Sequence, residues 1–235
     1  MTVHLSTSTW QQPVPAPVSA ERSTVVEHVR DLVLALGSGR LRVGIDGFTA
    51  SGKTSLGHEL AYALSDAGRP VLRASLDDFK KPWRDAHLYD RKSGEGYYRN
   101  AFDCEAMRRL LLEPAGPNGS GEVVLCSIDP ITQVDHTAEV THSPTDAVLV
   151  VDGVFAFRPE IDDCWDLRIW LDVRREMSIA RGEARDADWG ETESVHSTRY
   201  AVAADVYLAE VDARAQADVV IDNSDFARPR LLRSG

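Results

Sequence analysis

The chain has 235 residues, of which 43% are hydrophobic and 27% charged, as expected for a globular protein of one or at most two domains. Its 37 acidic residues outnumber its 26 basic ones, and the formal net charge of −11 argues against non-specific binding to nucleic acid. No apolar stretch reaches the ~18 residues of a membrane span, the N-terminus lacks the features of a signal peptide, and three widely spaced cysteines indicate neither a disulfide framework nor a zinc site. We therefore expect a cytoplasmic protein whose partner is a small molecule, with no role for nucleic acid or a membrane.

The first twenty residues are rich in Ser, Thr, Gln and Pro, with three alternating prolines. Because proline disfavours helix interiors and central strands, residues 1–20 are predicted to form a flexible arm. Residues 21–235 contain no internal repeat and no convincing domain boundary, so they are predicted to form a single domain. Its first helix is predicted from Ser23, because Thr24 and Glu27 have the spacing of a capping box.

Strands and helices alternate through the remainder of the chain. Short apolar runs predict strands over residues 41–47, 71–78, 123–128, 147–153, 167–173 and 217–223, the last of which is expected to end the fold. Apolar residues at helical spacing predict helices over about 53–68, 104–112 and 193–213, with a further helix after residue 173. This alternation predicts an α/β fold with a mostly parallel sheet covered by helices on both faces.

The most informative motif is GFTASGKT, residues 47–54, which matches the phosphate-binding pattern G-x-x-x-x-G-K-[ST] in full. It lies between a predicted strand and a predicted helix, where backbone N–H groups and the positive end of the helix can bind phosphate; a chance match is the alternative. Lys53 is expected to contact the β- and γ-phosphates of ATP, and Thr54 to bind Mg²⁺. The residues expected to contact ATP are Gly47, Thr49, Ala50, Ser51, Gly52, Lys53, Thr54 and Ser55.

Carboxylates at the ends of predicted strands are the next candidates. Asp152 follows an apolar run, where a second carboxylate can approach Mg²⁺; the alternative is a turn residue before Gly153. Asp77 and Asp78 end another strand and are expected to point to opposite faces. One of them could accept a proton from an acceptor hydroxyl, and Asp77 is also a candidate for the metal site, although both could be solvated in a loop.

Arginines cluster after the strand at 167–173. Arg181 and Arg185 are four residues apart and share a helix face, so they are predicted to belong to a lid over about 174–190 that offsets charge on the γ-phosphoryl group. A salt-bridged surface helix is the alternative, because acidic residues are interspersed among these arginines.

Aromatic residues are concentrated between the second predicted strand and the helix near residue 104. Their spacing is too irregular for a helix face, so they could build an acceptor pocket or an ordinary loop core. They are Phe79, Trp83, Tyr89, Tyr97, Tyr98 and Phe102.

Six segments together resemble the uridine kinase-like family of P-loop nucleoside kinases, which is related to phosphoribulokinase and bacterial-type pantothenate kinase. They are GIDGFTASGKT (44–54), SLDDFKKP (75–82), YYRNAFDCEAM (97–107), VLVVDGVFAF (148–157), DVRREMSIARGEARD (172–186) and the run RY…Y…ADVVIDN from Arg199 to Asn223. The resemblance implies a P-loop NTPase-type three-layer α/β/α fold around a five-stranded, mostly parallel sheet, with lid and acceptor-binding insertions. It also implies the use of ATP and Mg²⁺, and it suggests self-association into a homo-oligomer.

The same resemblance implies roles for individual residues. Asp77 would be the general base on a primary hydroxyl, Asp152 would stand in for a glutamate that serves Mg²⁺, and Arg181 and Arg185 would belong to the lid. Asp103 would bind ribose hydroxyls. The candidate acceptor-binding residues are Asp103, Phe79, Tyr98, Gln133 and Arg199.

Three positions depart from the family pattern. Uridine and cytidine kinases usually read the pyrimidine with a Tyr and a His, and this chain has Ile128 and Gln133 at those positions. Lys80 follows the DDF motif, where an aromatic residue is common. Glutamine can hydrogen-bond to a base edge and isoleucine cannot, so the identity of the acceptor stays open.

The sequence thus predicts an ATP- and Mg²⁺-dependent phosphotransferase acting on a primary hydroxyl, with the 5′-OH of a uridine- or cytidine-like nucleoside as the first candidate. One alternative acceptor is pantothenate or a sugar phosphate, whose negative charge Arg84, Arg91 and Arg99 could bind. Another alternative is a regulatory switch that hydrolyses nucleotide slowly, although the chain lacks the NKxD motif that reads guanine.

Overall fold

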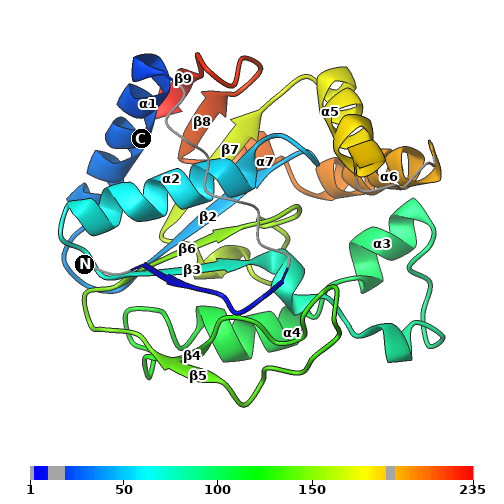
Figure 1. Cartoon of the computed structure of the whole chain (residues 1–235), viewed down its shortest axis with the longest axis horizontal. Coiled ribbons are helices and arrows are strands. Elements are labelled where there is room, and N and C mark those ends of the chain that lie inside the picture. Colours follow the sequence, from blue (N-terminus) through cyan, green and yellow to red (C-terminus); the bar gives the residue numbers. More distant parts are fainter. Residues whose placement is uncertain (1–2, 10–18, 189–193, 235) are drawn as a thin grey trace.

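A mainly parallel β-sheet forms the centre of the protein (Figure 1). The computed structural model describes residues 3–9, 19–188 and 194–234. Over these residues the sheet has seven strands in the order β1-β3-β6-β2-β7-β8-β9, all parallel to their neighbours except β9, which is antiparallel to β8. The strands are β1 Val3–Leu5, β2 Leu41–Gly47, β3 Val71–Ser75, β6 Val148–Asp152, β7 Leu167–Asp172, β8 Val219–Asp222 and β9 Arg230–Ser234.

The prediction of five strands was wrong by one strand at each edge. The five inner strands are the apolar runs that the sequence indicates, whereas β1 and β9 are short and carry polar residues. Such segments have no distinctive apolar pattern, and their pairing depends on an edge that only the folded sheet provides. For the same reason 217–223 was wrongly expected to end the fold.

Helices cover both faces of the sheet, which confirms the three-layer α/β/α arrangement. Side chains alternate along β6, so that Val148 and Val150 pack under α1 and α2 while Leu149 and Val151 pack under α3, α4 and α6. The α-helices are α1 Ala20–Ala35, α2 Lys53–Asp66, α3 Gly94–Asn100, α4 Cys104–Met107, α5 Arg175–Asp188, α6 Ser194–Glu210 and α7 Ala213–Gln216. Shorter turns are η1 Leu76–Phe79, η2 Trp83–Asp85, the π-helical η3 Arg108–Leu112 and η4 Asp162–Cys164.

The first helix begins earlier than its sequence pattern indicates. Its N-cap is Ser19, whose hydroxyl accepts a hydrogen bond from the backbone N–H of Arg22 at 3.0 Å. Thr24 lies inside the helix, where its hydroxyl donates to the carbonyl of Ala20 at 2.9 Å. The predicted capping box at Thr24 and Glu27 was therefore wrong, because Ser19, five residues before Thr24, caps the helix and adds a further turn.

Part of the expected N-terminal arm is ordered against the sheet. Residues 3–5 form β1, which pairs with β3, and the backbone N–H of Ser6 donates to the carbonyl of Arg73 at 2.9 Å. Thr9 donates from its backbone N–H and its hydroxyl to the carboxylate of Asp129, at 2.6 and 2.8 Å. The expectation of a flexible arm thus fails for residues 3–9, while residues 10–18 lie outside the described part of the chain.

The predicted strand at 123–128 does not join the central sheet. Instead β4, Glu122–Val124, pairs with β5, Val140–His142, in a separate antiparallel ribbon. All three cysteines are free thiols, as the sequence predicts. None of the described helices combines the length and apolar character that crossing a membrane requires.

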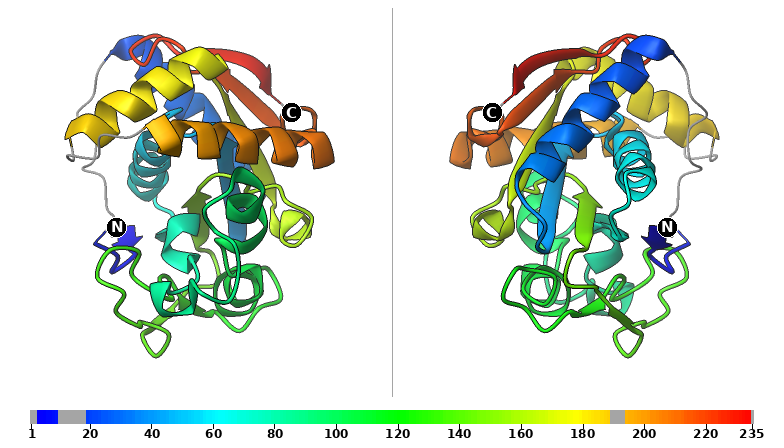
Figure 2. Two further views of the ribbon diagram at one scale, coloured as in Figure 1. Left: turned by 90° about the vertical axis from the view of Figure 1, so that its right-hand side faces the viewer. Right: turned by 90° about the vertical axis from the view of Figure 1, so that its left-hand side faces the viewer.

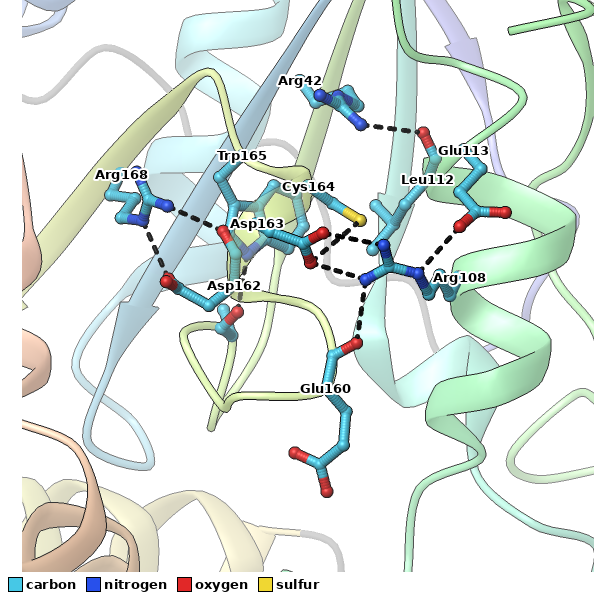
Figure 3. A network of polar contacts seen from close by, with 11 residues as sticks. Arg42, Arg108, Leu112, Glu113, Glu160, Asp162, Asp163, Cys164, Trp165 and Arg168 are labelled. Atoms are coloured by element: carbon cyan, nitrogen blue, oxygen red, sulfur yellow. Dashed lines mark hydrogen bonds and ion pairs between the residues drawn. The ribbon is translucent and has the colours of Figure 1, made fainter.

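A polar network fixes the end of the sheet opposite the phosphate-binding loop (Figure 3). Arg108 of η3 donates to both carboxylate oxygens of Asp163, at 2.5 and 2.8 Å, and to Glu113 at 2.8 Å. Beside it, Arg168 donates to the carboxylate of Asp162 at 2.9 Å. The network ties η3 to the loop that precedes β7.

Helix α6 packs across α3 beside the C-terminal ends of the parallel strands (Figure 2, left). A Cβ atom at Gly94 in α3 would lie 2.4 Å from the side chain of Val202 in α6, so glycine permits this close approach. The two helices therefore lie beside the phosphate-binding loop and border the space above it.

Candidate active site

The phosphate-binding loop connects β2 to α2 through an unusual backbone. Gly52, the N-cap of α2, has φ +96°, and a Cβ atom there would lie 2.5 Å from the side-chain nitrogen of Asn223. Gly47 has φ +151°, and its Cβ atom would lie 2.7 Å from the carbonyl oxygen of Leu171. The two fixed glycines of the motif are thus required by conformation and by space.

A cavity of about 280 Å³ opens above this loop. It gathers side chains from the loop, from the ends of β3 and β6, and from α3, α5 and α6. Its lining residues are Thr49, Ala50, Gly52, Lys53, Thr54, Ser55, Asp77, Lys80, Tyr97, Asp152, Gly153, Val154, Arg181 and Tyr200. Six of the eight residues expected to contact ATP are among them, together with the candidate carboxylates of Asp77 and Asp152.

Lys53 begins α2 and folds back over the loop. Its ammonium group donates to the carbonyl oxygens of Gly47 and Phe48, at 3.0 and 2.8 Å. This arrangement keeps the positive charge at the loop, where the terminal phosphates of a nucleotide would bind.

Thr54 and Asp152 lie together at the candidate metal position. The hydroxyl of Thr54 donates to Oδ2 of Asp152 at 2.7 Å, and Arg73 of β3 forms an ion pair with Oδ1 at 2.5 Å. Hydroxyl and carboxylate oxygens are ligands that suit Mg²⁺, which usually retains several waters and contacts the phosphates as well. The residues therefore fit a magnesium ion, and Arg73 is a partner that sequence reasoning missed because it lies in the middle of an apolar strand.

The two aspartates of the DDF motif point in different directions. Asp77 lines the cavity, and its Oδ1 lies 2.7 Å from the ammonium group of Lys80. Asp78 is buried, accepts a hydrogen bond from the backbone N–H of Ser75 at 3.2 Å and completes a capping box around η1. Burial raises the pKa of Asp78 to about 6. The geometry thus offers Asp77, and not Asp78, to a bound substrate.

Arg181 reaches the cavity from α5. Its guanidinium donates to the carbonyl oxygens of Asn223 and Ser224, at 3.2 and 2.6 Å, which holds it beside the phosphate-binding loop. The side chain of Arg185 lies outside the residues whose side chains are described, as do residues 189–193 of the expected lid.

The residues expected to bind the acceptor do not line the cavity. Phe79 is 0% exposed and belongs to the core, and the hydroxyl of Tyr98 donates to Glu210 at 3.0 Å. Asp103 caps α4, where its carboxylate accepts a hydrogen bond from the backbone N–H of Ala106 at 2.9 Å. Phe79, Tyr98 and Asp103 thus stabilise the fold through core packing, a hydrogen bond and a helix cap.

Gln133 and Arg199 are also engaged elsewhere. Gln133 accepts a hydrogen bond from the backbone N–H of Trp83 at 2.6 Å. The guanidinium of Arg199 lies 4.9 Å from the ring centroids of both Tyr97 and Tyr200, which line the cavity, but Arg199 itself does not.

Lys80, Tyr97 and Tyr200, which were not among the predicted acceptor-binding residues, line the cavity instead. Tyr97 precedes the predicted Tyr98, and the pitch of α3 turns the first ring toward the cavity and the second into the core. The two adjacent tyrosines in the sequence indicate that an aromatic ring lines the cavity. Which of the two rings does so depends on how α3 packs against α6.

Asp46 is a further residue that sequence reasoning missed. It is buried directly before the loop and accepts hydrogen bonds from the hydroxyl of Tyr207 at 2.6 Å and from the backbone N–H groups of Gly47 at 2.6 Å and Phe155 at 3.2 Å. Burial raises the pKa of its carboxyl group, against these hydrogen bonds. Asp46 thereby joins the start of the loop to α6 and to the segment after β6.

Comparisons with known proteins bear on the family. No family model matches the chain. A uridine kinase from Leuconostoc citreum is 26% identical over 155 residues, which cover 63% of this chain and 69% of that protein. A uridine kinase from Staphylococcus carnosus is 26% identical over 145 residues, covering 61% of this chain and 67% of that protein.

Solved structures share the fold. The structure of a possible uridine kinase from Bacillus stearothermophilus aligns with a TM-score of 0.62 and 24% identity, covering 83% of this chain and 96% of that one. D-glycerate 3-kinase from Cryptococcus neoformans aligns with a TM-score of 0.54 and 13% identity, covering 79% and 87% of the two chains. The sequence relatives and the shared fold together support a uridine kinase-like P-loop kinase that acts on a small molecule.

Proposed function

We propose that this small-molecule kinase transfers the γ-phosphoryl group of ATP to a primary hydroxyl of its acceptor with the help of Mg²⁺. The observation that carries the proposal is the convergence of the phosphate-binding loop, Asp152 and Asp77 on one cavity. A nucleotide switch needs the loop and the metal site but has no use for a second carboxylate placed to accept a proton from an acceptor.

In the proposed reaction the acceptor's hydroxyl oxygen forms a bond to the γ-phosphorus, and the bond between that phosphorus and the β,γ-bridging oxygen breaks. The hydroxyl proton passes to the carboxylate of Asp77, and ADP leaves with the electron pair of the broken bond. Lys53 and the loop N–H groups stabilise the negative charge on the phosphates, and the guanidinium of Arg181 stabilises it further.

Thr54 and Asp152 would hold Mg²⁺ in this scheme. The ion would neutralise charge on the β- and γ-phosphate oxygens when bound. Arg73 orients the carboxylate of Asp152, because it forms a buried ion pair with the oxygen that Thr54 does not contact.

A nucleoside 5′-OH is one candidate acceptor, supported by the names of the two sequence relatives. The two positions that correspond to the pyrimidine-reading residues give it no support, since Ile128 is buried and Gln133 binds the backbone of Trp83. The chemical class of the acceptor therefore has to be identified by testing compounds other than nucleosides as well.

The test is the rate of ADP release from Mg·ATP across a panel of hydroxylated acceptors, with phosphorylated product identified by mass spectrometry. We expect one or more acceptors to stimulate release in the wild type and none in Lys53→Ala, which should fold normally. Equal rates in the two proteins, or ADP release that no acceptor stimulates and that yields only inorganic phosphate, would contradict the proposal.

A further inference from the structure

The acceptor side of the cavity has an unusual charge arrangement. Lys80 extends from the end of η1 toward Asp77, with 2.7 Å between its ammonium nitrogen and Oδ1 of the carboxylate. The rings of Tyr97 and Tyr200 line the same side, and the ring centroid of Phe102 lies 5.8 Å from the ammonium group. A cation therefore lies directly beside the candidate base, where a bound acceptor would present its hydroxyl.

Lys80 is one of three basic residues among the described residues that line the cavity, and the other two lie on the nucleotide side. Lys53 donates to the carbonyl groups of the phosphate-binding loop, and Arg181 donates to those of Asn223 and Ser224. Both can be assigned to the phosphates of ATP. Lys80 is then the positive charge that faces the acceptor.

The arginines that the sequence offered for an anionic acceptor lie elsewhere. Arg99 is paired with Glu95 and Glu210, at 2.9 and 2.6 Å. Arg91 donates to the carbonyl of Lys81 at 3.0 Å, and Arg84 is exposed. None of the three lines the cavity.

A lysine in this position makes the carboxylate of Asp77 a weaker base, and an uncharged acceptor does nothing to reverse that effect. A cation in contact with a carboxylate favours its ionised form and so makes it a weaker proton acceptor. Burial lowers the pKa of Lys80, but the carboxylate of Asp77 and the phenol groups of Tyr97 and Tyr200 together outweigh that effect, so the pKa lies above its ordinary value and the ammonium group stays charged. An anionic group on the acceptor would compete for this ammonium group and release Asp77 to accept the proton.

We propose that Lys80 binds a carboxylate or phosphate group carried by the acceptor, so that the substrate is a small hydroxylated acid rather than a neutral nucleoside. This inference rests on the proposed phosphoryl transfer and names its substrate class. The cavity of about 280 Å³ must also admit the terminal phosphates of ATP, which favours a compact acceptor.

The test compares acceptors in pairs that differ by one anionic group while both members keep a primary hydroxyl. Suitable pairs are glycerol and glycerate, panthenol and pantothenate, ribulose and ribulose 5-phosphate, and uridine and uridine 3′-phosphate. The carboxylate pairs and the phosphate pairs distinguish the two sources of charge. We expect the anionic member of at least one pair to have the higher kcat/KM, by roughly 10- to 100-fold.

Three variants separate the anion-binding role of Lys80 from its effect on Asp77. Lys80→Met should lower the kcat/KM ratio between the anionic and the neutral member of a pair to near one, and Lys80→Arg should restore much of it. Lys81→Met is the matched control, because the neighbouring lysine lies 4.7 Å from the ring centroid of Tyr89 and does not line the cavity. A general loss of activity with an unchanged ratio would overturn the proposal while leaving the kinase reaction intact.

A binding measurement tests whether Lys80 binds an anionic group even if no compound is phosphorylated. Calorimetric titration of the Mg·ADP-bound protein with glycerate, pantothenate and ribulose 5-phosphate should show saturable binding that is lost in Lys80→Met and kept in Lys81→Met. Absence of binding by all three anions, with Mg·ADP bound normally, would overturn the anionic subsite. Absence of turnover with binding intact would instead contradict the proposed phosphoryl transfer.

Discussion

The hydroxyl of Thr54 donates a hydrogen bond to Oδ2 of Asp152 over 2.7 Å, which joins the first turn of α2 to the end of β6. The two residues are 98 positions apart in the chain and meet because β2 and β6 are neighbours in the sheet. The contact brings together the two oxygen donors proposed for Mg²⁺.

Replacing Thr54 with Val removes one of these donors while keeping the shape of the side chain. The Mg²⁺ concentration needed for half-maximal phosphoryl transfer should rise about tenfold or more, measured at saturating ATP. Thr54→Ser, which keeps the hydroxyl, is the control and should need little more Mg²⁺ than the wild type. The same Mg²⁺ dependence in all three proteins would remove Thr54 from the metal site.

Asp77→Asn should lower kcat by at least about 100-fold, because an amide cannot take the proton of the acceptor hydroxyl. Binding of ATP, measured by calorimetry, should change little, since the phosphates are held by the loop. Asp78→Asn is the matched control and should keep most of the activity. If Asp78→Asn abolished transfer and Asp77→Asn did not, the base would have been assigned to the wrong carboxylate.

Asp78 should make stability depend on pH. Burial raises the pKa of Asp78 from 3.8 to about 6 in the folded protein, outweighing its hydrogen bonds. Between these values the folded chain holds a proton that the unfolded chain has released, so this contribution to the free energy of unfolding decreases as pH rises. The full penalty, roughly 3 kcal/mol, is present above pH ~6.

The measurement is urea unfolding of the wild type and Asp78→Asn at pH values from about 4 to 8. The amide never ionises, so the variant should gain stability relative to the wild type as pH rises, with most of the gain complete by neutral pH. A difference in unfolding free energy that stays constant over this range would show that Asp78 does not titrate as described.

Removing the residues before Ser19 should destabilise the protein. The deletion removes β1 from the edge of the sheet and leaves the buried carboxylate of Asp129 without the two hydrogen bonds from Thr9. We expect Tm to fall by about 5 °C or more in differential scanning calorimetry. Thr9→Ala should produce part of this decrease, whereas an unchanged Tm in the deletion variant would show that this segment contributes little.

The sequence by itself determined the inner sheet and the phosphate-binding loop. Each depends on residues close together in the chain. An apolar run between turn residues is buried in almost any fold that contains it, and GFTASGKT carries its own backbone conformation through Gly47 and Gly52. The candidate metal pair was also predictable, because both residues follow parallel strands, whose carboxyl ends meet at one edge of the sheet.

The tertiary structure decided which side chains face the cavity. Tyr97 and Tyr98 are alike in sequence, as are Asp77 and Asp78, and only the packing of α3 on α6 and the capping of η1 turn one member of each pair outward. Edge strand β1 likewise needed an existing edge to pair with. Contacts between distant segments leave no local pattern in the chain, because each depends on a surface that forms only after the rest has folded.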